Sequence, residues 1–314
     1  MTIAMSTQSL SRRFGRTLAL NHIDLGVPEG AVYALVGANG AGKTTLIKVL
    51  MNIMRPTSGT AQVFGLDSHK VTGKIFQRIG YVSENQELPE WMTVAEMLAY
   101  YRRFYPIWDQ SLQQKLSRQF DLPLNRKLKQ LSRGVRMKAA FVGSLSFHPA
   151  LIVLDEPFSG LDPMVRNELV ECLKERAPAT TVFLSSHDLD EIESFSNHLG
   201  FLQQGRLLFS EAMSVLSNRF REVTVTLPVP TSLASDPPPA WQQIEAQDSV
   251  LHFVHNHYDE ASSRAEIAAL LPMAHTIQVE PMSLRSIFLS IVKSARVEDS
   301  PASQPPAGAA RVDA

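Results

Sequence analysis

The chain has 314 residues, 44% of them hydrophobic and 19% charged, with a formal net charge of -1. This composition is typical of a globular protein, and a charge so close to zero provides no overall attraction for nucleic acid, so we expect no nucleic-acid partner. The single cysteine, Cys172, excludes an internal disulfide framework and a metal site built from several cysteines. We interpret Cys172 as a small buried residue of a helix.

Two further absences bear on where the protein works. No run of residues approaches the roughly 20 consecutive apolar positions that a membrane-spanning helix needs. Residues 1–15 contain no apolar core of signal-peptide length. We therefore expect a cytoplasmic protein, peripheral on the cytoplasmic face of the cell membrane, which it reaches through a partner or a surface.

Strand-like and helical patterns alternate over the first two thirds of the chain. Apolar runs bounded by turns predict strands, and apolar positions at helical spacing predict helices between them. Such alternation indicates a parallel sheet covered by helices on both faces, with a helical insert at about 90–148. The predicted strands are 18–27, 31–37, 59–65, 78–83, 150–157, 180–186 and 198–209, and the predicted helices are 43–54, 93–105, 109–120 and 132–147.

A change of pattern near 214–221 predicts a second domain. We assign residues 1–215 to the first domain, 216–296 to a small α+β domain, and 297–314, rich in proline, alanine and serine, to a disordered tail. Three histidines, His252, His255 and His257, fall on or beside a predicted strand of the second domain, and that strand carries no cysteine or carboxylate as a companion. We interpret them as surface residues rather than a metal site.

The segment Gly37 to Thr45 matches the pattern G-x-x-x-x-G-K-[ST] at every fixed position, with a strand before it and a helix after it. Glycines let the backbone wrap so that successive N–H groups point at phosphate oxygens, and the helix start adds its positive dipole end. Lys43 would contact the β- and γ-phosphates, and Thr44 would offer a hydroxyl to Mg²⁺. The predicted nucleotide-binding residues of this loop are Gly37, Asn39, Gly40, Ala41, Gly42, Lys43, Thr44 and Thr45.

An acidic pair follows a second apolar strand, in the sequence Leu-Ile-Val-Leu-Asp-Glu-Pro at 151–157. Asp155 stands at the carboxyl end of the strand, where α/β sheets bind ligands, and can hold the Mg²⁺ shell. Glu156 follows directly and is the candidate that activates a water for attack on the γ-phosphate. These two segments define a P-loop nucleoside triphosphatase. The sequence contains no guanine-reading Asn-Lys-x-Asp motif.

Five further segments along the chain stand out beside these two. They are 12–20 with Phe14, 78–86 with Glu84, Leu-Ser-Arg-Gly-Val at 131–135, Ser-Gly-Leu-Asp-Pro at 159–163, and a strand that ends in His187. The series resembles the ATP-binding subunits of ABC transporters over roughly residues 6–215. The resemblance implies an α/β fold, a P-loop core of ABC ATPase type with an antiparallel β subdomain and a helical insert, that hydrolyses ATP with Mg²⁺.

The resemblance also implies roles for single residues. Phe14 corresponds to the aromatic residue that stacks on adenine, an interaction of roughly 1–3 kcal/mol. Asp162 corresponds to the residue that faces the partner subunit, and His187 to the histidine that contacts the γ-phosphate. Glu84 stands where the family usually has glutamine. Its carboxylate can still ligate Mg²⁺ or accept a hydrogen bond from water, whereas Gln86 can substitute only if the loop shifts.

The segment 131–135 matches the family signature at Leu131, Ser132 and Gly134 but has Arg133 and Val135 instead of glycine and glutamine. Ser132 can donate its hydroxyl to a phosphate, and the N–H groups of 133–135 begin a helix that can bind an anion. Ser132 is also a suitable N-cap, which is the purely structural interpretation. The charge of Arg133 favours phosphate in either case.

The resemblance implies that the signature segment of one subunit closes over the ATP held by the P-loop of another. Because this chain carries one of each, two subunits would complete each site. The partner is a second copy or a paralogous ATPase subunit. Separate integral membrane permease subunits would dock on the helical insert near Glu84, where Trp91 and Trp108 either supply the docking surface or pack within the insert. The variant segments resemble the branch that exports drugs, antibiotics or lipid-like substrates. The alternatives are a soluble ABC-type regulatory ATPase not coupled to transport and an ABC-type ATPase acting on DNA or ribosomes. The regulatory alternative includes an ATP sensor with little turnover, in which the departures at Glu84 and 131–135 mark decay.

Overall fold

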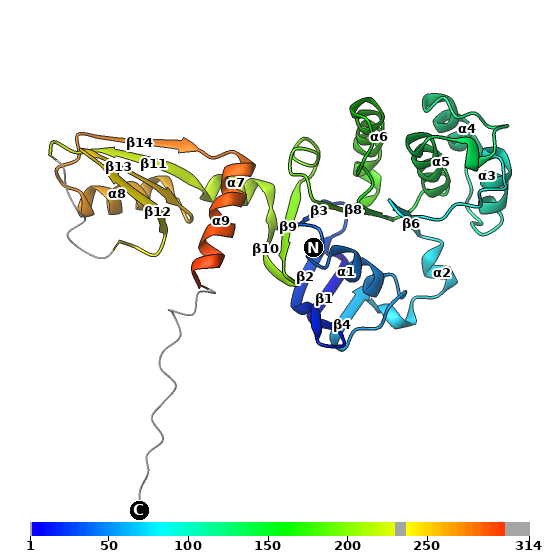
Figure 1. Ribbon diagram of the computed structural model, residues 1–314, viewed down its shortest axis with the longest axis horizontal. Helices are drawn as coiled ribbons and strands as arrows, with labels where there is room; N and C mark the ends of the chain where they lie inside the picture. The colour runs from blue at the N-terminus through cyan, green and yellow to red at the C-terminus, as the bar shows by residue number, and fades with distance from the viewer. Residues whose placement is uncertain (1, 230–236, 299–314) are drawn as a thin grey trace, which may run out of the picture. The chain divides into compact units, whose positions relative to one another are not determined.

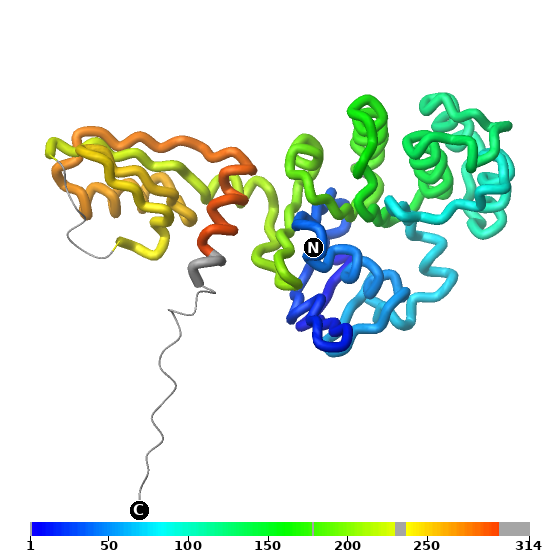
Figure 2. The backbone as a smooth tube through the Cα atoms, viewed as in Figure 1, coloured from blue at the N-terminus to red at the C-terminus, as the bar shows by residue number. Residues whose placement is uncertain are grey.

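The computed structural model describes residues 2–229 and 237–298, and it forms two compact units, Met1–Met213 and Ser214–Ala314. The division lies two residues before the boundary predicted at 215/216. Figure 2 follows the backbone through both units. Within the described residues, no helix is long and apolar enough to cross a membrane.

The first unit is built on a six-stranded sheet in the order β10-β9-β3-β8-β7-β6 (Figure 1). The strands from β9 to β6 run parallel, and β10 pairs antiparallel with β9 at one edge. Residues of β3, β7 and β8 are buried along their whole length, as expected for a parallel sheet covered on both faces. The strands are β3 (Val32–Val36), β6 (Ile79–Ser83), β7 (Leu151–Asp155), β8 (Thr181–Ser186), β9 (His198–Gln203) and β10 (Arg206–Ala212).

A second, antiparallel sheet has the order β2-β1-β4-β5. Its strands are β1 (Ile3–Phe14), β2 (Thr17–Pro28), β4 (Ser58–Val63) and β5 (Leu66–Asp67). Helix α1 (Lys43–Leu50) shares one hydrophobic core with both sheets, through residues such as Leu46 and Ile47. This common core holds the loop before α1 against the carboxyl edge of the parallel strands.

A helical insert follows β6 (Figure 1), and its helices begin at side-chain caps. Thr93 and Glu96 form a capping box at the start of α3 (Val94–Arg102). Asp109 caps α4 (Gln110–Gln119), and Ser132 caps α5 (Arg133–Leu145). Elsewhere in this unit lie α2 (Gly73–Phe76) and α6 (Pro163–Arg176). The fold class predicted for this unit is confirmed.

Several elements of the first unit differ from the sequence-based prediction, among them the short β5 and α2, which were not predicted. The first strand, β1, begins at Ile3, in residues that were not assigned, and α6 was missed. The run 198–209 is a hairpin of β9 and β10, because Gln204 and Gly205 both adopt positive φ (47° and 77°), which reverses the chain in a tight turn. Cys172 lies in α6, where it is buried as predicted, and burial raises the pKa of its thiol to about 11.

The second unit contains an antiparallel sheet in the order β12-β13-β11-β14. Its core includes Trp241, whose ring stacks on Phe253 with centroids 4.0 Å apart. The interpretation of His255 as a surface residue is wrong, because its side chain is buried. The elements are α7 (Met213–Arg219), β11 (Arg221–Thr226), β12 (Trp241–Gln247), β13 (Val250–His255), α8 (Glu260–Leu270), β14 (Thr276–Pro281) and α9 (Leu284–Glu298). Residues 297 and 298 of the predicted tail belong to α9, and 299–314 lie outside the described residues.

Candidate nucleotide-binding and catalytic site

The phosphate loop occupies residues 37–42, between the end of β3 and the start of α1. Gly42 is the N-cap of α1 with φ 111°, and a Cβ at this position would lie 2.6 Å from the carbonyl oxygen of Ala19. Only glycine fits this backbone. No side chain caps the helix at Gly42, so the first N–H groups of α1 are available to phosphate oxygens.

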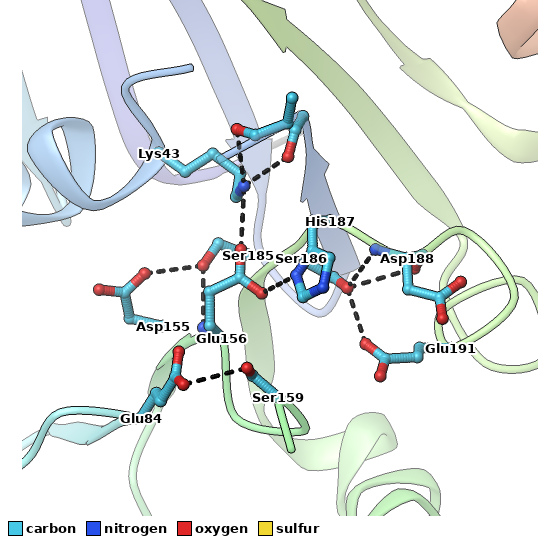
Figure 3. A network of polar contacts seen from close by, with 12 residues as sticks. Lys43, Glu84, Asp155, Glu156, Ser159, Ser185, Ser186, His187, Asp188 and Glu191 are labelled. Atoms are coloured by element: carbon cyan, nitrogen blue, oxygen red, sulfur yellow. Dashed lines mark hydrogen bonds and ion pairs between the residues drawn. The ribbon is translucent and has the colours of Figure 1, made fainter. Parts of the chain in front are cut away.

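Lys43 is buried and points back under the loop. Its ammonium donates to the carbonyl oxygens of Gly37 and Ala38, and it pairs with Glu156 Oε1 at 2.9 Å (Figure 3). Its side chain is 5% exposed, and that of Glu156 is 13% exposed. Because the pair is shielded from water, removal of one partner would leave an uncompensated buried charge, which is strongly destabilising.

The side chains of Thr44 and Asp155 bring together two oxygen atoms that could ligate a metal, at the carboxyl end of β7. Both Thr44 Oγ1 and Ser185 Oγ donate to Asp155 Oδ1, at 3.0 and 2.8 Å. Burial raises the pKa of the Asp155 carboxyl, and the two hydrogen bonds oppose that rise. A hydroxyl beside a carboxylate suits Mg²⁺, which is held by one or two protein oxygens plus substrate phosphates. Within residues 2–229 and 237–298 no cluster of three His, Cys, Asp or Glu side chains forms an all-protein metal site.

Glu156 lies between a lysine and a histidine. While Oε1 pairs with Lys43, Oε2 is 2.8 Å from Nδ1 of His187 (Figure 3). Glu156 has φ 51°, an uncommon value for this residue type, and its N–H donates to Ser185 Oγ at 3.0 Å. The left-handed backbone turns Glu156 out of the strand, so two consecutive acids point to different partners.

Glu84 begins the loop after β6, at the same sheet edge. Its N–H donates to the carbonyl oxygen of Asp155 at 2.9 Å. Its Oε1 accepts from Ser159 Oγ at 3.0 Å and from Arg133 at 2.5 Å. The side chain at 84 thus lies beside the acidic pair (Figure 3), and Gln86 contributes none of these contacts.

The remaining predicted residues lie apart from this cluster. Phe14 ends β1 with 43% of its surface exposed, and the Arg12 guanidinium lies over its ring at 4.6 Å. Ser132 Oγ accepts from Val135 N–H at 3.4 Å, and Asp162 accepts from the N–H groups of Met164 and Val165. Both residues therefore act as helix caps in the single chain.

Sequence reasoning missed two serines of the site, Ser185 and Ser159. Ser185 pairs in register with Asp155 across β7 and β8, and its hydroxyl contacts both acids of the pair. A further network joins Ser186, Glu191 and Arg166. The available signal was the Ser-Ser pair ahead of His187, because adjacent parallel strands end at the same edge.

Three comparisons place this geometry among known proteins. Residues 20–159 match the family model described as "ABC transporter". The chain is 30% identical over 228 residues to the bacitracin transport ATP-binding protein BcrA of Enterococcus faecalis, covering 71% of this chain and 74% of that protein. It is 32% identical over 221 residues to the daunorubicin resistance ATP-binding protein DrrA2 of Streptomyces coeruleorubidus, covering 68% and 69%.

A solved structure shows the same fold. It is the dimeric post-hydrolysis state of the ATP-binding cassette MJ0796 bound to ADP and Pi, with a TM-score of 0.60 and 21% identity, covering 67% of this chain and 98% of that chain. A phosphate loop, a hydroxyl–carboxylate pair and a shared glutamate at one sheet edge define a P-loop ATPase. The chain belongs to the ABC transporter family, as an ATP-binding subunit.

Proposed function

We propose that Glu156 is the general base of ATP hydrolysis in this subunit. The observation that carries the proposal is the Glu156 carboxylate, which is shared between Lys43 at 2.9 Å and His187 at 2.8 Å. When ATP binds, its γ-phosphate competes for the Lys43 ammonium, and Glu156 Oε1 becomes available to a water. The water attacks the γ-phosphorus, the bond to the ADP oxygen breaks, and Glu156 takes the water proton.

The other side chains hold the substrate and the proton acceptor in place. His187 orients Glu156 and contacts the γ-phosphate, while the N–H groups at the start of α1 bind phosphate oxygens. Thr44 and Asp155 would hold Mg²⁺, which neutralises phosphate charge. Glu84 lies beside them and is the third candidate ligand through its second oxygen. Phe14 offers its exposed face to the adenine ring.

Completion of each site requires a second ATPase subunit, either a second copy or a paralogue. Ser132, Gly134 and Asp162 lie at the starts of α5 and α6, away from the Lys43 cluster. The Ser132 capping bond occupies the Val135 amide, which a partner's ATP phosphate can take over. A two-fold arrangement places the α5 start of each subunit over the nucleotide of the other.

ATP hydrolysis by this subunit drives separate membrane subunits, which it contacts at the cytoplasmic face of the membrane. The matched relatives are named for bacitracin transport and daunorubicin resistance, which supports export of a drug-like, antibiotic or lipid-like substrate. A groove lined by residues such as Asn85, Leu88 and Met137 lies beside Glu84, and Trp91 at its rim is 72% exposed. Trp108 is half-buried and donates to Gln113, so it contributes less to a docking surface.

The assembled site argues against the regulatory alternative. A sensor that has lost turnover need not retain its lysine, base and histidine in mutual contact, whereas Lys43, Glu156 and His187 form one network here. The second alternative, action on DNA or ribosomes, gains no support from a chain with a net charge of -1.

ATP turnover by the purified full chain tests the proposed chemistry. We expect Glu156→Gln to lower kcat by at least about 10²-fold with little loss of ATP affinity, because only proton acceptance is removed. Lys43→Ala should abolish ATP binding. The matched control is Lys174→Ala, which breaks the exposed Lys174–Glu171 pair. That pair has the same N–O distance as the Lys43–Glu156 pair, 2.9 Å, and its loss should change neither kcat nor ATP affinity. Unchanged turnover in Glu156→Gln would show that the base is another group.

Coupling to a membrane protein needs a separate experiment. The full chain carrying an affinity tag is purified from detergent-solubilised membranes of its own cells, and the integral membrane protein that accompanies it is identified. Trp91→Asp should weaken this association while ATP affinity stays unchanged, because Trp91 lies outside the nucleotide site. Association that tolerates Trp91→Asp would move the docking surface elsewhere.

A further inference from the structure

Two of the three departures from the family pattern, Arg133 and Glu84, meet in space. Arg133 and Glu84 are 49 residues apart in sequence, yet the guanidinium nitrogen Nη2 lies 2.5 Å from Glu84 Oε1. Ser159 Oγ donates to the same oxygen at 3.0 Å. One oxygen of Glu84 thus receives both donors, and neither contact involves the other carboxylate oxygen.

The position of Glu84 brings its negative charge close to the proposed nucleotide site. Its backbone N–H donates to the carbonyl oxygen of Asp155, which places the residue at the sheet edge that already carries Asp155 and Glu156. A further unpaired carboxylate here would repel the phosphates of an incoming nucleotide. The side chain is 26% exposed, so water screens this charge only in part.

The local backbone accommodates the arginine. Arg133 is the first residue of α5, and its guanidinium lies over Gly160, where a Cβ would be 3.1 Å from Nη1. Gly160 has φ 64°, and the absence of a side chain leaves this space to the guanidinium. Glu84 and Gly160 therefore bring two loops against the Arg133 guanidinium, and Ser159 of the second loop donates to Glu84.

We propose that Arg133 is a positioning residue that neutralises Glu84 and holds it beside the nucleotide site, so that the two departures function only as a pair. Arg133 cancels the extra negative charge and directs one oxygen of Glu84, which leaves the second oxygen for a water or Mg²⁺. The proposal rests on the ATP site proposed above, and it explains why a glutamate is tolerated where the family usually has glutamine.

A double-mutant cycle on the full chain tests this coupling. The variants are Arg133→Gln, Glu84→Gln and the double variant, and the readout is the Kd of the non-hydrolysable analogue AMP-PNP with Mg²⁺, measured by titration calorimetry. We expect Arg133→Gln to weaken binding about fivefold at low salt and less at high salt, because it exposes the Glu84 charge. The double variant should bind within about twofold of the wild type. Arg133→Lys, which retains the charge, should keep most of the affinity.

A neighbouring ion pair provides the matched control. Arg136 and Glu90 also join α5 to the segment before α3, at 3.6 Å and with a more exposed carboxylate than Glu84. Arg136→Gln, which breaks this pair, should leave the Kd unchanged. If Arg133→Gln and the double variant weaken binding equally, Arg133 acts independently of Glu84 and the proposal is overturned. Equal Kd values for the wild type and all three variants would overturn it too. If Lys43→Ala binds like the wild type, the proposed ATP site itself is wrong.

Discussion

At the scale of single residues, the Asp155 carboxyl is buried although its proposed function requires a charge. Burial raises its pKa, and the hydrogen bonds from Ser185 and Thr44 counter this only in part. In the isosteric variant Asp155→Asn the amide oxygen can still accept both bonds. We expect the free energy of unfolding to rise by about 1 kcal/mol at neutral pH while ATPase activity is lost, measured by urea denaturation and phosphate release.

The pH dependence of that difference has a definite sign. Because the folded-state pKa of Asp155 is raised, the cost of its charge is present above the folded-state pKa and disappears below the unfolded value, about 3.9. The stability advantage of Asp155→Asn should therefore shrink as the pH falls through the acid range. An advantage that stays constant with pH would show that desolvation of the charge is not its origin.

Ser185 supports both acids and should matter more than its size indicates. Its hydroxyl donates to Asp155 and accepts from the N–H of Glu156, and the side chain is fully buried. Ser185→Ala should lower the free energy of unfolding by about 1–2 kcal/mol and also reduce kcat. Ser144→Ala removes a bond to a backbone carbonyl, that of Tyr81, and should reduce stability alone. Equal kcat values in both variants would contradict this role of Ser185.

At the scale of elements, β13 of the second unit contains a buried histidine that faces α8. Burial lowers the pKa of His255, which the carboxylate of Glu266 at 3.7 Å opposes. Since the folded-state pKa is depressed, stability is present above the unfolded value of about 6.5 and is lost as the pH falls through the folded-state pKa.

We expect thermal unfolding of the second unit to occur at a lower temperature at pH 5.5 than at pH 7.5, followed by fluorescence of its Trp241. His255→Gln should weaken this pH dependence, whereas His275→Gln, at an exposed histidine of the same unit, should leave it unchanged. The same pH dependence in wild type and His255→Gln would assign the effect to other groups.

The elements also show what sequence reasoning could and could not provide. The phosphate loop and the acidic strand were found because their chemistry depends on local spacing, as in residues 37–45. Ser185 and Ser159 were missed because they meet Asp155 and Glu84 through strand pairing and loop packing across 30 and 75 residues. Helix α6 was missed because its buried residues are confined to Leu169, Val170, Cys172 and Leu173. No local pattern revealed that Arg133 reaches Glu84.

At the scale of the whole molecule, a site completed by a second subunit predicts association that depends on ATP. Glu156→Gln, which should bind ATP without turnover, is expected to sediment as a dimer with Mg-ATP and as a monomer without nucleotide. Adding Ser132→Glu should prevent dimer formation, because a carboxylate would then oppose the partner's phosphate. A dimer that persists in this double variant would exclude the α5 start from the interface.

The exposed ring of Phe14 has a consequence for which nucleotide the subunit consumes. Stacking on an aromatic face involves the π-surface that every purine has, and it does not distinguish the groups at the purine rim. Affinity then comes chiefly from the triphosphate, which ATP and GTP share. We expect kcat/KM for GTP to lie within about tenfold of that for ATP, and Phe14→Ala to weaken both alike. In the cell, the relative concentrations of ATP and GTP would then decide which of the two nucleotides is hydrolysed.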